Sequence, residues 1–151
     1  MSTYSLKRTQ ILSTTLDHAW DFFSDPAKLN EITPAYMDFK ILSNSGEGRI
    51  FAGQIITYTV KPLLKIPLFW MTEITHVKDR EYFVDEQRFG PYAFWHHTHF
   101  FKEVPAGVEM TDVVHYKLPL GFAGRLGKGL VTKKLEGLFD HRYEVLEKKI
   151  W

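Results

Sequence analysis

His97 and His99 stand one residue apart in a stretch of alternating residues, with Trp95 before them and Phe101 after them. Alternate residues of a β-strand face the same side, so this spacing predicts a strand face with two imidazoles between two aromatic rings. An imidazole can act as a general base, ligate a metal ion or form hydrogen bonds, and burying it without a partner is costly. These histidines are therefore the candidates for chemistry, and their partners define the site.

Carboxylates and an amide occupy matching positions in the strands predicted on either side of the histidines. Asp85 and Gln87 precede the Gly90-Pro91 chain reversal, and Asp112 lies in the strand that follows the histidines. Residues opposite each other on neighbouring antiparallel strands lie within contact range. We therefore expect a shared polar floor formed by Asp85, Gln87, His97, His99 and Asp112. The same alternation predicts an apolar lining of Trp70, Phe83, Phe89, Trp95, Phe101, Met110 and Tyr116, with Leu135 and Phe139 from the last helix.

Three interpretations of this polar floor stay open at the level of sequence. In the first, each imidazole hydrogen-bonds a carboxylate or Gln87, as buried polar groups normally do. In the second, the floor orients a mostly apolar ligand in a cavity. In the third, His97 or His99 is a general base tuned by Asp112 or Asp85, or the His-x-His pair and an Asp hold a metal ion. We expect neither a resident metal nor a cofactor, because His-x-His alone is a weak signal.

The elements that must position these residues can be identified from periodicity. Residues 4–12 alternate as a strand, residues 16–23 have the apolar spacing of a helix, and residues 27–32 form a second short helix before Pro34. From Met37 to Leu118 the pattern is almost entirely strand, which gives about seven strands in an antiparallel meander. From Leu130 apolar residues recur at helical spacing, which predicts a long C-terminal helix packed on the sheet. Its predicted apolar stripe consists of Val131, Leu135, Leu138, Phe139, Leu146 and Ile150.

Composition limits the classes of function. The chain has 151 residues, 44% of them hydrophobic, which suits one domain over residues 1–151 with a real core. Its 19 basic and 18 acidic residues leave a charge of +1, which argues against a nucleic-acid binder. There are no cysteines, so thiol nucleophiles and disulfides are excluded. Without a signal-peptide pattern or a run long enough to span a bilayer, we expect a soluble, cytoplasmic protein with no stable membrane insertion.

The order of these elements and several motifs resemble a known superfamily. The motifs are QRFGPY (87–92), WHHTHFF (95–101), DVVHYKLPLG (112–121) and LNEITP (29–34). Together they resemble the bacterial ligand-binding proteins of the START, birch-pollen-allergen and polyketide-cyclase (SRPBCC) superfamily, over essentially the whole chain. The resemblance implies an α+β helix-grip fold, in which a curved antiparallel sheet wraps a long C-terminal helix around a deep cavity. It implies no particular reaction, because one fold hosts carriers, cyclases and receptors alike.

The expected function is binding of an apolar or amphipathic small molecule of lipid, polyketide or aromatic type between sheet and helix. One alternative is a cyclase or dehydratase that moves protons with His97, His99 and Asp112. Another is an accessory module that binds a partner protein. A homodimer stays open, and the sequence does not determine the ligand, the pathway or whether any reaction is catalysed.

Two further segments have an open role. The apolar loop over residues 63–69 could be a lid, a dimer contact or a membrane-touching loop, or it could pack on Trp20 or the terminal helix. The glycine-rich run over residues 121–129 lacks the G-x-x-x-x-G-K-[ST] order of a phosphate loop, so nucleotide binding is rejected. We expect that run to be an entrance hinge, with Arg125 and Lys128 near the cavity mouth.

Overall fold

A computed structural model describes residues 3–62, 64–119 and 127–151. Its elements, in chain order, are β1 (Tyr4–Leu12), α1 (Leu16–Phe23), the 3₁₀ helices η1 (Pro26–Ile32) and η2 (Ala35–Met37), β2 (Lys40–Asn44), β3 (Gln54–Val60), β4 (Leu68–Lys78), β5 (Tyr82–Phe89), β6 (Phe94–Val104), β7 (Gly107–Lys117) and α3 (Lys128–Lys148). This is the order predicted from the sequence, with short helices after the first strand and one long helix at the end.

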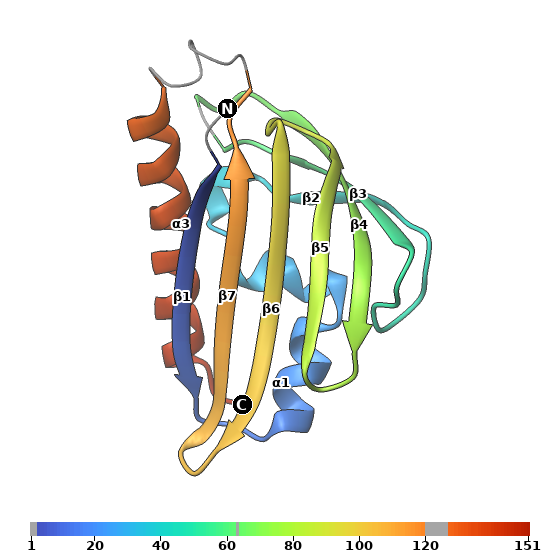
Figure 1. The fold of residues 1–151 in the computed structure, drawn as a ribbon, viewed down its shortest axis with the longest axis vertical. Coiled ribbons are helices and arrows are strands. Elements are labelled where there is room, and N and C mark those ends of the chain that lie inside the picture. The colour runs from blue at the N-terminus through green and yellow to red at the C-terminus, as the bar shows by residue number, and fades with distance from the viewer. Residues whose placement is uncertain (1–2, 63, 120–126) are drawn as a thin grey trace.

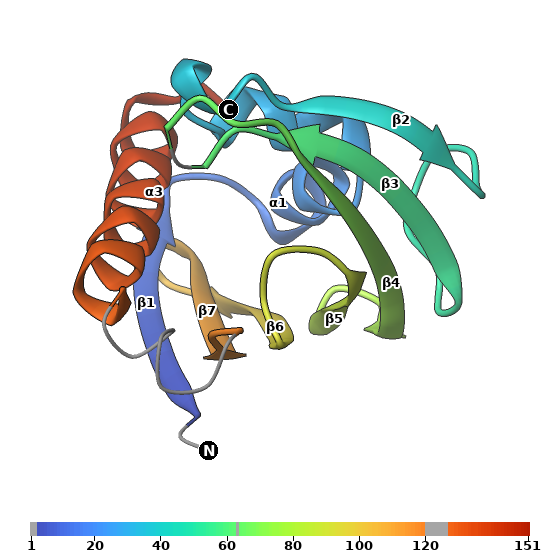
Figure 2. The same ribbon diagram turned by 90° about the horizontal axis from the view of Figure 1, so that it is seen from above.

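The strands form one antiparallel sheet in the order β1-β7-β6-β5-β4-β3-β2. Strands β2 to β7 follow one another as a meander, and β1 closes the sheet by pairing with β7. The sheet curls strongly, with α3 running beside β1 and the short helices covering the rest of the concave side (Figures 1 and 2). The residues expected to form the polar floor therefore face an enclosed interior.

Local sequence explains the helices α1 and α3. Thr15 caps α1 by accepting a hydrogen bond from the His18 amide at 3.3 Å, and Asp17 places a negative charge in the first turn. Trp20 is buried on the inner face of α1, where its ring meets Phe83 and Phe101 edge-on. In α3 the buried residues are Leu135, Phe139 and Leu146, all of them in the predicted stripe.

Two sequence-based boundaries differ from the structure. The strand expected from Ile50 begins at Gln54, because Gly53 has a φ of 95° and ends a turn that precedes the strand. Ile150, expected in the apolar stripe, is 97% exposed because α3 ends at Lys148. Periodicity alone does not locate either end, since a strand or helix stops where its backbone conformation changes.

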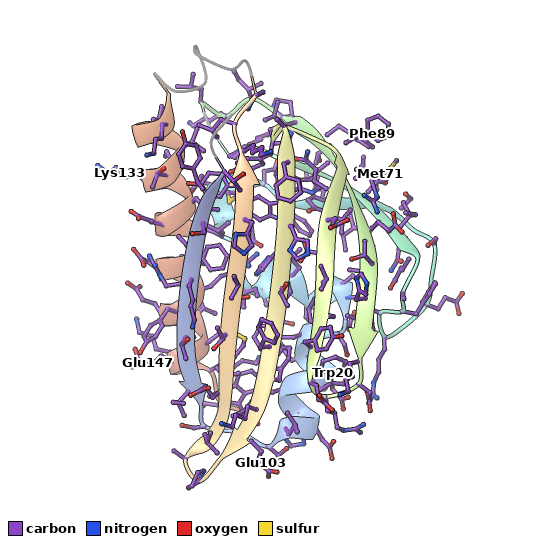
Figure 3. The ribbon with its side chains drawn as sticks, viewed as in Figure 1. Trp20, Met71, Phe89, Glu103, Lys133 and Glu147 are labelled. Carbon is purple, nitrogen blue, oxygen red and sulfur yellow. The ribbon has the colours of Figure 1, made fainter. Side chains whose placement is uncertain are left out.

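A β-bulge in β5 decides which way its last residues face. Thr72 pairs with Gln87 whereas Met71 pairs with Phe89, so Arg88 is an extra residue in β5. One inserted residue turns the following side chain to the opposite face of the sheet. Phe89 consequently points outward beside Met71 (Figure 3) and is 65% exposed. The expectation that Phe89 lines the cavity is wrong.

The described part of the apolar loop is largely exposed. Leu64 is 79% exposed, and Ile66 and Phe69 are also exposed. This exposure argues against packing of Leu64 and Ile66 on Trp20 or the terminal helix, whereas Leu68 is half-buried and lines the cavity. The other interpretations of the loop stay open. Within the described ranges, no helix has the length and apolar character needed to cross a membrane. The hinge expected at residues 121–129 falls mostly on residues 120–126, outside the described residues.

Candidate functional site

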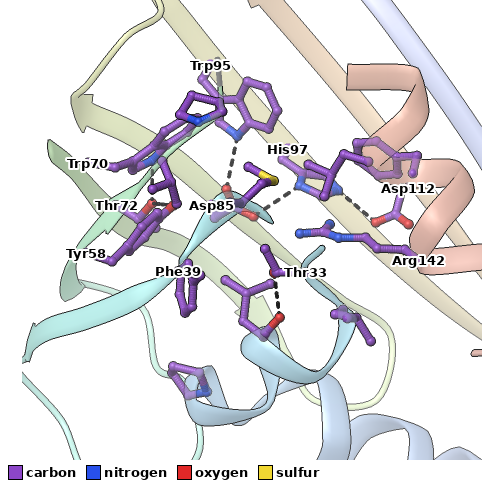
Figure 4. A pocket seen from close by; sticks show the side chains of 18 of the residues that line it. Thr33, Phe39, Tyr58, Trp70, Thr72, Asp85, Trp95, His97, Asp112 and Arg142 are labelled. Atoms are coloured by element: carbon purple, nitrogen blue, oxygen red, sulfur yellow. Dashed lines mark hydrogen bonds and ion pairs between the residues drawn. The ribbon is translucent and has the colours of Figure 1, made fainter. Parts of the chain in front are cut away.

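A cavity of about 340 Å³ lies between the concave face of the sheet, α3 and the short helices. Most of its wall is apolar, with polar groups gathered on β5, β6 and β7 (Figure 4). Ten of the residues predicted at the site line it: Trp70, Phe83, Asp85, Trp95, His97, His99, Met110, Asp112, Leu135 and Phe139. The alternation of residues along β4, β5, β6 and β7 therefore predicted most of the side chains with which these strands line the cavity.

Four of the predicted residues do not line the cavity. Phe89 points outward for the reason given above. Phe101 is buried in the apolar cluster around Trp20, and Tyr116 is buried at the other end of the sheet, where its hydroxyl lies 3.2 Å from Oγ1 of Thr132. Each packs against aromatic neighbours instead: Phe101 against Trp20 and Phe83, and Tyr116 against Tyr92 and Trp95.

Gln87, the fourth of these residues, has a structural contact instead of a place on the polar floor. Its Nε2 donates to the carbonyl of Tyr92 at 2.7 Å, and its Oε1 accepts from the Tyr92 amide at 3.1 Å. The Gln87 side chain thus closes the Gly90-Pro91 reversal through two hydrogen bonds to the backbone of Tyr92. A Cβ on Gly90 would lie 2.5 Å from Gln87 Oε1, so this closure requires glycine there. Closing the loop sets Tyr92, which was not predicted, against Trp70 and Trp95 at the cavity wall.

His97 and His99 form a closed ring of contacts with Asp85 and Asp112. Asp112 Oδ1 lies 2.7 Å from Nε2 of His97 and 3.0 Å from Nδ1 of His99. On the other side, Asp85 Oδ2 lies 2.7 Å from Nε2 of His99 and 3.4 Å from Nδ1 of His97. Each imidazole therefore lies between two carboxylates. Strand register places them so, because Asp85 pairs with His97 and His99 pairs with Asp112.

Aromatic neighbours hold this four-residue ring, which we call the His–Asp ring. The imidazoles of His97 and His99 lie with their centroids 3.7 Å apart, and Phe83 stacks on His99 at 4.1 Å. Trp95 Nε1 donates to the second oxygen of Asp85 at 3.2 Å. His97 is only 3% exposed. The geometry fixes both imidazoles and leaves them little freedom to turn.

Burial and the contacts within the His–Asp ring shift the pKa of each of its four residues. Burial alone would raise the pKa of Asp112, but hydrogen bonds from His97 and His99 outweigh it and hold that pKa well below its usual range. Burial likewise opposes ionisation of Asp85, and the two histidines again lower its pKa. Burial and the neighbouring His99 lower the pKa of His97. Burial disfavours protonation of His99 too, but hydrogen bonds to Asp112 and Asp85 raise its pKa.

These directions assign a protonation pattern to the His–Asp ring. The lowered pKa values of Asp85 and Asp112 favour ionised carboxylates, and the opposite shifts of the two imidazoles favour protonation of His99 before His97. The second nitrogen of His97, Nδ1, lies 3.4 Å from Asp85 Oδ2, and the imidazole borders the cavity. A neutral imidazole that borders a cavity can accept a proton from a bound molecule.

The same atoms permit the metal alternative. One donor atom from each of Asp85, His97 and His99 lies within 4.8 Å of the others, a set that suits a divalent transition metal. However, the 2.7 Å separation between Asp85 and His99 is that of a hydrogen bond. We therefore treat the His–Asp ring as a hydrogen-bonded network.

Arg142 is a residue of the site that sequence reasoning missed. It extends from α3 into the cavity, below His97 and near Asp112 in Figure 4. The signal was present in the sequence: Arg142 lies one helical turn from Leu138, Phe139 and Leu146, within the apolar stripe of the helix. A cation within an apolar stripe indicates a buried charge with a function or a partner.

A second polar group lies on the opposite wall of the cavity. Trp70 Nε1 donates to Oγ1 of Thr72 at 3.0 Å, and the Tyr58 hydroxyl lies 3.2 Å from the same oxygen. Burial raises the pKa of the Tyr58 hydroxyl, so it stays neutral. This group adds hydroxyls to the wall without adding charge.

No family model matches the chain, and no curated protein matches its sequence. Solved structures do match its fold. An uncharacterized protein from Rhizobium leguminosarum has a TM-score of 0.72 at 14% identity, over 98% of this chain and 97% of that one. The KanY protein gives 0.73 at 13% identity, over 98% and 97%.

A third similar structure holds a ligand. A norcoclaurine synthase point mutant from Thalictrum, in complex with a transition-state analogue, has a TM-score of 0.68 at 15% identity, over 97% of this chain and 96% of that one. The chain has the helix-grip fold. At identities this low the likeness concerns the fold, and function has to be argued from the site.

Proposed function

We propose that this protein binds an apolar or amphipathic small molecule, of lipid, polyketide or aromatic type, in the cavity between sheet and α3. The observation that carries the proposal is the cavity itself: about 340 Å³ of space with a mostly apolar wall and a few polar groups. Ligand sites typically have this composition, because apolar surface supplies affinity and a few polar groups supply orientation. We also propose that the chain is a ligand-binding SRPBCC protein, on the motifs and the shared fold.

The test is native mass spectrometry of protein purified from its own host, followed by denaturing extraction of any bound molecule. We expect a stoichiometric small molecule. In a Leu138→Trp variant the larger side chain should occupy part of the cavity and remove that molecule, since Leu138 lines it. Glu147→Trp, on the exposed face of the same helix, is the matched control and should retain it. Equal retention in both variants would contradict binding in this cavity.

A second candidate function is proton-transfer catalysis of the cyclase or dehydratase type. It is favoured by one observation: His97 and His99 line the cavity, and each contacts two carboxylates. His97 would accept a proton from a bound substrate, with Asp112 stabilising the imidazolium that forms. His97→Ala should then abolish turnover of the substrate, while His115→Ala, on the outer face, should leave it unchanged. If both variants retained turnover, this candidate would be excluded.

A further inference from the structure

The guanidinium of Arg142 forms no hydrogen bond or ion pair with the residues that the structure describes. Its Nε atom is buried and has no hydrogen-bond acceptor among the residues described. The guanidinium lies over the ring of Phe139, whose centroid is 5.2 Å from the guanidinium carbon. A guanidinium carries five N–H donors and stays protonated in proteins. Arg142 therefore presents a charged donor group to an apolar cavity.

The carboxylates of the site do not neutralise this charge by direct contact. Asp85 uses both of its oxygens on His97, His99 and Trp95, and Asp112 uses Oδ1 on both histidines. Their charge acts on Arg142 from a distance: burial lowers the pKa of the guanidinium, and Asp112 and Asp85 oppose that shift. Neither carboxylate forms an ion pair with Arg142, so a molecule held in the cavity can supply the acceptor that the buried Nε lacks.

We propose that Arg142 binds the carboxylate of an amphipathic acid whose apolar body fills the cavity, an inference that rests on the proposed function. A guanidinium binds a carboxylate through two parallel N–H···O bonds, which are strong and directional. The apolar residues around Arg142, among them Leu138 and Phe139, would exclude water from this pair. The ligand class is therefore a monocarboxylic acid with a hydrocarbon or aromatic body.

The size of the cavity limits that class further. About 340 Å³ lies at the lower end of the range of roughly 300–1,000 Å³ found for ligand pockets. A single chain or ring system of medium length fits this space, and a lipid with two long chains does not. Arg142 comes from α3 and the aromatic wall from β4 and β6, so the acid would lie across the cavity from helix to sheet.

Decanoate and decan-1-ol are matched probes, because they share a ten-carbon chain and differ in the polar group. Each is titrated into the full chain by isothermal titration calorimetry, as wild type and as Arg142→Met and Lys133→Met. Lys133 lies on the exposed face of α3, so its variant removes the same charge outside the cavity. We expect Arg142→Met to weaken decanoate binding by about 30-fold or more and to leave decanol binding unchanged. Lys133→Met should leave both unchanged.

The outcomes separate the two proposals. If Arg142→Met weakens decanoate and decanol equally, or weakens neither, the carboxylate site is overturned and the binding cavity stands. If the wild type binds neither decanoate nor decan-1-ol, both the proposed binding of medium-chain ligands and the proposed carboxylate site are contradicted. Should Arg142→Met fail to fold, Arg142→Lys keeps the charge and loses the two-point geometry. Decanoate binding to that variant should be several-fold weaker than to wild type, and equal binding would overturn the proposal.

Discussion

His97 and His99 lie with their ring centroids 3.7 Å apart on one face of β6, and both contact the same oxygen of Asp112. Two imidazolium ions at this separation would repel each other in a buried site. Protonation of His99 is therefore favoured over protonation of His97, in line with the opposite shifts of their pKa values. This relationship underlies the stability of the interior and its response to pH.

Removing Asp112 should destabilise the fold strongly. Asp112→Ala leaves His97 and His99 buried with a donor each and no acceptor on that side, and breaking a buried charged pair costs about 3–5 kcal/mol. Urea unfolding measures the change in the free energy of unfolding. The control is Asp140→Ala, whose exposed carboxylate lies 3.5 Å from Arg8 and should contribute little. Equal effects of the two substitutions would contradict the buried network.

Stability should depend on pH in opposite directions on the two sides of about pH 6.5. The pKa of His99 is raised from its ordinary value of 6.5, so above that value the folded state holds more protons and stability falls as pH rises. The pKa of His97 is lowered from 6.5, so stability falls as pH decreases below it. Asp85 and Asp112, with lowered pKa values, add a further loss below about pH 4.

Thermal unfolding between pH 4 and 9 tests this dependence. In His99→Gln the loss of stability on the alkaline side should disappear, because the group that titrates there is gone. His115→Gln, on the exposed face of the neighbouring strand, should keep the wild-type profile. If the stability of His99→Gln still fell as the pH rose above about 6.5, the protonation pattern assigned to the His–Asp ring would be refuted.

The bulge at Arg88 predicts that two phenylalanines of β5 differ in their effect on stability. Phe83 is buried and stacks on His99, so Phe83→Ala should cost about 3–5 kcal/mol. Phe89 is exposed beyond the bulge, and Phe89→Ala should change the free energy of unfolding little. Chemical denaturation of both variants distinguishes this arrangement from an unbroken strand, in which both would be costly.

Gln87 should act on the cavity through Tyr92. Gln87→Ala removes both hydrogen bonds that close the Gly90-Pro91 reversal and should destabilise the protein by about 1–3 kcal/mol. Because Tyr92 lines the cavity, decan-1-ol should also bind more weakly to this variant. Thr9→Ala, which removes an exposed hydroxyl 2.9 Å from that of Thr111, is the control for binding. Weaker decanol binding in both variants would contradict a specific role for Gln87.

The sequence alone determined the architecture and much of the site. Strands with one buried face have to alternate, so the two-residue period placed Asp85, His97, His99 and Asp112 on the same face before any pairing was known. The helical spacing after Leu130 identified α3 in the same way. Such predictions succeed because they depend on local periodicity, which a single strand or helix already carries in its sequence.

Tertiary structure decided what periodicity does not encode. The extra residue at Arg88 turned Phe89 outward, because a bulge depends on how two strands pair. Gln87 does not belong to the polar floor, because its side chain forms two hydrogen bonds with the backbone of Tyr92 in the loop that it closes. Arg142 entered the cavity because the curved sheet encloses the face of α3 on which it lies. These three outcomes depend on contacts between distant segments, so only the folded chain could settle them.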